Sequence, residues 1–146
     1  MTISRKLESA LLAIFQADAT TKEIGPDLRH FFDNTQPRAP LALIVHAFPA
    51  QNANFAEPAG GSWWTVRVET IALAPVTRDE DNRRVDSLHA RVEAIYGNLT
   101  ASQINAQLTG DLAGFTIDGI VHDAPEDLAD DAAIGRTYAF TLHGHT

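Results

Sequence analysis

Hydrophobic and polar residues along this chain follow two periods, and the order of these periods predicts the elements. Apolar residues that recur every three or four positions indicate amphipathic helices, whereas strict alternation or a short unbroken apolar run indicates a β-strand. The predicted elements, in chain order, are a helix over Ser4–Gln16, strands over Leu41–Phe48 and Ser62–Val76, a helix over Asn82–Leu99, and strands over Phe115–His122 and Gly135–His143.

The order α-β-β-α-β-β predicts an α+β fold. A length of 146 residues suits a single domain, which we expect to span residues 1–146. We expect a mostly antiparallel four-stranded sheet with the Asn82–Leu99 helix packed on it, preceded by the N-terminal helix. The apolar stripe of that first helix is narrow, so it must lie on a sheet face or on a neighbouring subunit. If Gly97 ends the Asn82–Leu99 helix in a left-handed turn, Ala101–Leu108 is predicted to be a second short helix.

Two segments carry local signals that a structure can test. The alternation in Ser62–Val76 shifts after Thr70, which predicts either a β-bulge or a strand whose second half is covered on both sides. Gly25-Pro26-Asp27 predicts the start of a short helical turn carrying Leu28, Phe31 and Phe32, because proline suits the first helical position.

A long segment and an aromatic pair are the candidate contact residues. Pro49–Gly61 is rich in Ala, Asn, Pro and Gly, and a loop of this length without structure of its own is often functional. Adjacent strand residues point to opposite faces, so one core cannot easily absorb both members of the Trp63-Trp64 pair, and exposed aromatics mark interfaces. We predict interface roles for Asn52, Phe55, Trp63 and Trp64.

Composition narrows the functional classes. The net charge of −8 should repel the phosphate backbone of nucleic acids, which favours either plain solubility or a surface that DNA can pass without binding. Cysteine is absent, which excludes disulfides and thiolate chemistry. The longest apolar run, Leu41–Ala47, is much shorter than the roughly 20 residues of a membrane helix. We expect no membrane association and folding in a cytoplasm.

Metal and cofactor signatures are weak. His143 and His145 lie two residues apart, but zinc takes three or four ligands. The acidic stretch around Glu126 and Asp127 lacks the alternating ligands and the glycine of a calcium-binding EF-hand loop. No phosphate-binding glycine motif occurs in the sequence. His46, in an apolar strand, is predicted to be a hydrogen-bonded core histidine. We expect no cofactor and no metal.

The alternative is a small α+β enzyme or ligand-binding domain that uses the His122/Asp123 region. Asp118, His122 and Asp123 cluster near one predicted strand end. No serine or cysteine stands in a nucleophile-elbow setting, so we predict that the protein is not an enzyme.

The sequence resembles the tail terminator, or tail completion, proteins of tailed phages. The likeness is densest in WWTVRVETIALAPVTRDEDNRRVDSLHARVEAIYGNL, where a long strand ends at a polar turn and enters a helix. The closing strand GRTYAFTLHGHT is similar in character to the last strand of that family. The resemblance covers most of the chain and is one of architecture, without a diagnostic motif.

The resemblance implies a structural virion protein located in the tail and assembled in the host cytoplasm. It implies a homo-oligomeric ring, usually of six copies, seated on the last ring of the tail tube protein. Such a ring ends tube polymerisation and offers a surface to the head-tail connector protein, while DNA passes through without specific binding. A neck or minor tail protein, or a component of a cellular injection machine related to phage tails, would look similar at this level.

Overall fold

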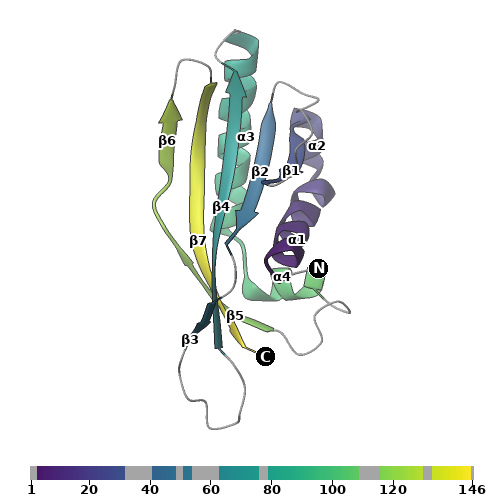
Figure 1. Cartoon of the computed structure of the whole chain (residues 1–146). Helices are drawn as coiled ribbons and strands as arrows, with labels where there is room; N and C mark the ends of the chain where they lie inside the picture. The colour runs from purple at the N-terminus through teal and green to yellow at the C-terminus, as the bar shows by residue number, and fades with distance from the viewer. Residues whose placement is uncertain are drawn as a thin grey trace.

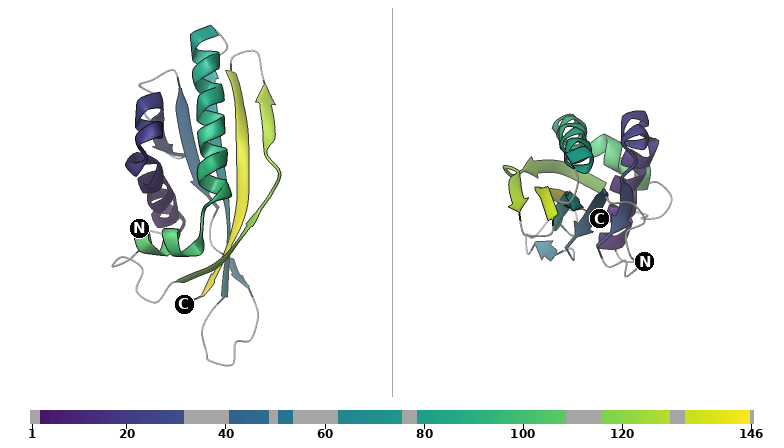
Figure 2. Two further views of the ribbon diagram at one scale, coloured as in Figure 1. Left: turned by 180° about the vertical axis from the view of Figure 1, so that it is seen from behind. Right: turned by 90° about the horizontal axis from the view of Figure 1, so that it is seen from above.

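The structure, a computed structural model, describes residues 3–31, 41–48, 51–53, 63–75, 79–108, 116–129 and 133–145. Within these residues the chain forms an α+β fold, with α1 and α3 on the same face of one sheet (Figures 1 and 2). The helices are α1 (Ile3–Ala17), α2 (Ala19–Ile24), α3 (Asp79–Gly97) and α4 (Ala101–Leu108). The strands are β1 (Asp27–His30), β2 (Ala42–Ala47), β3 (Gln51–Ala53), β4 (Trp63–Pro75), β5 (Thr116–His122), β6 (Glu126–Ala129) and β7 (Ala133–His145).

Within the described residues the sheet contains seven strands rather than the predicted four. Its order is β1-β2-β4-β7-β5, with β3 paired to β4 and β6 paired to β7. The four predicted strands correspond to β2, β4, β7 and β5, which are neighbours in antiparallel pairs. The β1–β2 pair is parallel, so the sheet is mixed. The additional strands are short and polar, and they pair along strands that the sequence pattern does predict.

No bulge occurs at Thr70, because β4 and β7 pair in unbroken register from Trp63↔His145 to Pro75↔Ala133. Val66 and Val68 are buried on one face of β4, and Thr70 continues that face with no exposed surface. Its hydroxyl forms a hydrogen bond with the buried Tyr96 hydroxyl of α3. The alternation therefore shifts in the sequence only because a polar residue, Thr70, occupies a core position, where its hydroxyl has a hydrogen-bond partner.

The register shift of the sheet lies in β5 instead, between Ile117 and Gly119. The Asn105 side chain of α4 accepts a hydrogen bond from the Ile117 amide at 2.8 Å and donates to the Ile117 carbonyl at 2.9 Å. These two bonds satisfy backbone groups that an irregular ladder would leave unpaired.

The predicted stripe of the second amphipathic helix is confirmed in α3. Val85, Leu88 and Val92 have no exposed surface. This helix begins earlier than predicted, at Asp79, since acidic residues are favourable at the positive end of a helix. The predicted short helix over Ala101–Leu108 is α4, with the same bounds.

Helix α1 buries its narrow stripe inside the same chain. It packs on β1 and β2, and Leu7, Leu11 and Phe15 are fully buried. The stripe therefore lies on the sheet of its own chain, and a neighbouring subunit is not required to bury it.

The helical turn predicted after Gly25 is wrong. Gly25 is the C-cap of α2, with φ of 73°, and its N–H donates to the Thr21 carbonyl at 2.9 Å. The chain then extends, and Leu28 pairs with Leu43 in the parallel β1–β2 ladder. Parallel pairing depends on the distant strand β2, which local turn signals do not report.

Candidate functional site

Strand β3 and the start of β4, which carry three of the four predicted contact residues, lie at the end of the sheet that extends beyond the helices (Figure 1). Asn52 of β3 pairs with Trp64 of β4, and Trp63 pairs with His145 of β7 on the other side of β4. Phe55 lies outside the described residues. The backbone thus brings three of the four candidates together on neighbouring strands, and the long segment after β2 includes β3 rather than being all loop.

The sheet face opposite α1 and α3 carries a row of three rings, from His46 of β2 and from the residues that directly follow β1 and β2. The Phe31 ring stacks on His46, with centroids 4.2 Å apart and planes 11° apart, and His46 lies 4.3 Å from the Phe48 ring. Phe31 is 47% exposed. The prediction of a core histidine at position 46 is wrong, because His46 is half-buried on this open face and packs between two phenylalanines.

A network of two ion pairs, which Arg67 forms with Glu69 and Asp123, lies on the same open face and joins β4 to the residue that follows β5. Arg67 donates to Asp123 at 2.8 Å and to Glu69 at 3.4 Å. The bond to Asp123 is the main cause that raises the pKa of Arg67. The His122 ring packs instead against Phe140, with centroids 5.6 Å apart.

His122 and Asp123 both line one small pocket, but their side chains have different partners. Asp123 is engaged by Arg67, whereas the His122 ring packs against Phe140. Within the described part of the chain no hydrogen bond joins His122 to Asp123. A general base oriented by a carboxylate needs such a bond, so the pair lacks the geometry of a catalytic dyad.

A small pocket of about 200 Å³ lies beside His122, between the end of α3 and strand β7. Its two tyrosines act as buried hydrogen-bonding groups. Burial raises the pKa of Tyr138 to about 12, and its hydroxyl donates to the His89 carbonyl at 3.1 Å. Burial also raises the pKa of Tyr96, whose hydroxyl is bonded to Thr70. Both phenols therefore stay neutral at physiological pH and support the core.

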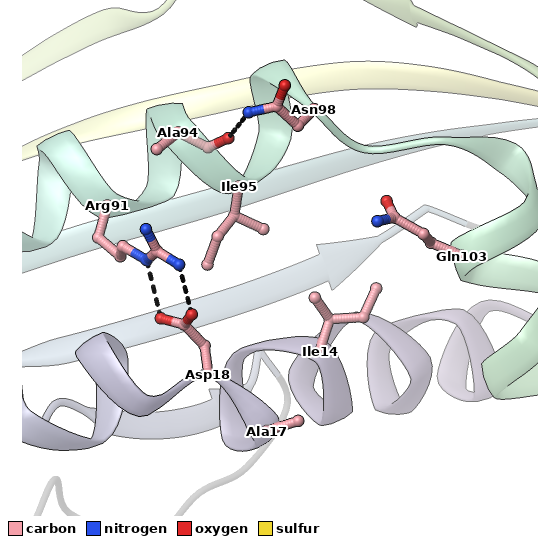
Figure 3. A pocket seen from close by; sticks show the side chains of 8 residues that line it. All are labelled: Ile14, Ala17, Asp18, Arg91, Ala94, Ile95, Asn98 and Gln103. Atoms are coloured by element: carbon pink, nitrogen blue, oxygen red, sulfur yellow. Dashed lines mark hydrogen bonds and ion pairs between the residues drawn. The ribbon is translucent and has the colours of Figure 1, made fainter.

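A larger groove of about 390 Å³ separates the end of α1 from α3 and α4 (Figure 3). Ile14 and Ile95 line it and pack against the hydrophobic core. Its two charged residues neutralise each other, because Arg91 binds the Asp18 carboxylate in a bidentate manner, with bonds of 2.8 and 2.5 Å. Figure 3 shows this pair spanning the groove from α3 to the start of α2.

Asp18 is also the N-cap of α2. Its Oδ2 accepts the Thr21 amide at 2.9 Å and the Thr21 hydroxyl at 2.7 Å. The hydrogen bond from Arg91, together with the Thr21 bonds, holds the pKa of the Asp18 carboxyl well below its usual range. The Asp18 carboxylate therefore both caps α2 and, through Arg91, holds the start of α2 against α3.

Substitutions at Asp18 should separate these two roles. Asp18→Ala loses both and should lower the free energy of unfolding by about 1.5–3 kcal/mol, the sum of about 1–2 kcal/mol for a lost N-cap and about 0.5–1 kcal/mol for the lost ion pair. Asp18→Asn keeps a good cap and loses only the ion pair, so we expect a cost of about 0.5–1 kcal/mol. Urea unfolding of both variants at neutral pH measures the difference.

The pH dependence of the free energy of unfolding provides a second test of the ion pair between Asp18 and Arg91. The folded pKa of Asp18 is lowered, so its contribution is present above the unfolded value of about 3.9 and is lost as pH falls towards the folded value. The stability gap between the parent and Asp18→Asn should therefore narrow below about pH 4. A gap that is constant with pH would contradict a stabilising charge on Asp18.

A partly buried hydrogen-bonded chain in α1 and β1 was not predicted from the sequence. His30 Nδ1 lies 2.8 Å from Glu8 Oε1, and Ser9 Oγ lies 3.4 Å from His30 Nε2. The other Glu8 oxygen accepts the Ala47 amide at 3.0 Å. The residue types are those of a hydrolytic triad, but the serine bond is long and Glu8 anchors the end of β2. We assign this cluster a structural role that ties α1 to β1 and β2.

Two further features bear on function. The described residues contain no group of three or more His, Asp or Glu side chains placed to hold a metal ion. His143 is exposed, and the side chain of His145 lies outside the described residues. None of the described helices is both long and apolar enough to cross a membrane.

Comparisons with known proteins give structural matches. No family model and no curated protein matches the sequence. A chain of the virion of a native gene transfer agent particle aligns over 95% of this chain and 94% of its own length, with a TM-score of 0.57 and 12% identity. A second solved protein, without a descriptive name, aligns over 99% and 96%, with a TM-score of 0.53 and 14% identity. At these identities the likeness establishes a shared fold over nearly the whole chain.

Proposed function

We propose that the protein is a structural virion component that caps the tail tube as a ring, ends tube polymerisation and presents the surface that joins tail to head. The observation that carries this proposal is the match over nearly the full length of both chains to a chain of a gene transfer agent virion. The sequence resemblance to tail terminator proteins supports the finer role. The ring, of six copies, would contact the tail tube protein and the head-tail connector protein, and DNA would pass through it.

The geometry of the described residues is compatible with this role. The sheet end that carries β3 and the start of β4 projects beyond the helices and would reach a partner ring (Figure 1). The polar groups at the three sites described above all form hydrogen bonds within the chain. The Tyr138 hydroxyl bonds to the His89 carbonyl, Arg91 to Asp18, and His30 to Glu8. These bonds hold helices and strands together, which supports an assembly role over catalysis.

A tube-capping assay tests the proposed function. Purified protein added to polymerising tail tube protein from the same genome should shorten the tubes and add a ring at one end, both visible by negative-stain electron microscopy. Disruption of the gene should give overlong tubes and heads without tails. Tubes of unchanged length without terminal rings, and normal particles from the disrupted gene, would overturn the capping role.

A further inference from the structure

We propose that neighbouring subunits of the ring meet through opposite charge, with the β6 edge of one copy docked on a basic corner of the next. The basic corner is formed by Lys22 of α2 and by Arg83 and Arg84 of α3, and the docking partner is a second copy of this chain. The inference rests on the proposed ring and names the surfaces by which its subunits meet.

Two cations of the basic corner, Lys22 and Arg83, have no side-chain partner among the described residues. The described arginines other than Arg83 have hydrogen-bond or ion-pair partners within the chain; they are Arg5, Arg29, Arg67, Arg84, Arg91 and Arg136. Arg83 and Lys22 are exposed, and neither side chain has such a partner among the described residues. Two cations without a partner in the described part of the chain thus lie on neighbouring helices of an acidic protein.

A pocket of about 330 Å³ opens at this corner, lined by Glu23, Ile24, Arg83, Arg84 and Ser87. Arg84 forms its floor, because its Nη2 donates to the Ile24 carbonyl at 2.7 Å and so joins α2 to α3. No ion pair joins Glu23 to either arginine within the described residues. A carboxylate that enters from outside would therefore meet the Arg83 guanidinium without displacing a partner among the described residues.

The opposite edge of the sheet is acidic. Between Thr116 and Gly135 the sequence has six Asp and Glu residues and neither Lys nor Arg; the acidic residues are Asp118, Asp123, Glu126, Asp127, Asp130 and Asp131. Glu126 is exposed and has no partner among the described residues, whereas Asp127 is held by Arg136 at 2.8 Å. Of the strands that the structure describes, β6 pairs only with β7, so its outer edge faces away from the sheet.

The two surfaces are placed as a ring requires. A cyclic ring needs two different patches on each subunit, so that patch one of each copy meets patch two of the next. In Figure 1, β6 and α2 lie on opposite sides of the molecule at the same end of the sheet. Neighbouring copies set side by side would bring the carboxylate of Glu126 towards Arg83, and opposite charges would fix which faces meet.

Charge reversal tests this contact. Arg83→Glu alone and Glu126→Arg alone should each place like charges across every interface, so we expect closed rings to fall by at least about tenfold. An equimolar mixture of the two variants should form alternating rings, and one chain with both substitutions should recover assembly. Native mass spectrometry at high concentration and ring density on tube ends measure these populations. Gln107→Glu, at an exposed position of α4 at the other end of the sheet, is the control.

The outcomes separate the interface from the ring itself. If the parent protein forms no ring in solution or on tube ends, the proposed function and this contact both fail. If the parent forms rings and the reversed variants form them equally well, only the contact is overturned. Loss in the single variants without recovery in the mixture would also overturn it. Arg83→Gln removes the charge with little steric change, and thermal melts check that each variant is folded.

Discussion

Leu88→Asp is expected to leave the protein unfolded at room temperature. Leu88 has no exposed surface and lies at the centre of the α3 stripe, between Val85 and Val92, facing β4. An aspartate there loses the leucine packing and buries a carboxylate without a partner. The cost should reach about 4–5 kcal/mol or more, which is comparable to the whole stability of a small domain.

Circular dichroism during a thermal melt measures this effect, with Ala90→Asp as the matched control. Ala90 is exposed on the same helix, so an aspartate there should cost only about 0.5 kcal/mol through helix propensity. Leu88→Ala should lie between the two, at about 2–5 kcal/mol, because it leaves a cavity without a buried charge. A Leu88→Asp protein that melts like the parent would show that α3 does not pack on the sheet through this stripe.

The sequence predicts those elements whose pattern is set by burial along a single segment. The stripe of α3 and the bounds of α4 follow from side chains that face one core, and so do the strands β2, β4, β5 and β7. Strands β1, β3 and β6 are short and rich in residues with low β propensity, and they form because a longer neighbouring strand offers a free edge. Their existence is decided by tertiary pairing.

The candidate contact residues and the internal bonds of the site were predictable only where a signal lies within a single segment. The sequence pointed to Trp63 and Trp64, and the backbone places them beside β3 at the projecting end. The bond between Asp18 and Arg91 joins residues far apart in the chain, and so does the bond between Glu8 and the Ala47 amide. Neither partner carries a local motif. The stacking of Phe31 on His46 likewise depends on the parallel β1–β2 pair.

Replacing residues 54–62 with a two-residue Asn-Gly turn should abolish tube capping while the protein stays folded. Ala53 of β3 pairs directly with Trp63 of β4, so a two-residue hairpin turn can close the ladder at this point. The buried core lies elsewhere, among α1, α3 and the helix-facing side of the sheet, so the melting temperature should change little. If the projecting β3–β4 end contacts the tail tube, the variant loses contact surface that includes Phe55.

A protein with residues 54–62 in scrambled order provides the control, since it keeps the length of the segment and changes its side chains. Capping by the scrambled protein but not by the shortened one would mean that reach matters, because the segment must span the distance to the next ring. Loss in both would mean that specific side chains make the contact. Normal tube lengths and infectious particles from the shortened, folded protein would rule out a contact role for residues 54–62. In that case the ring would have to engage the tube through another part of the sheet, for which the row of Phe31, His46 and Phe48 on the open face is the next surface to substitute.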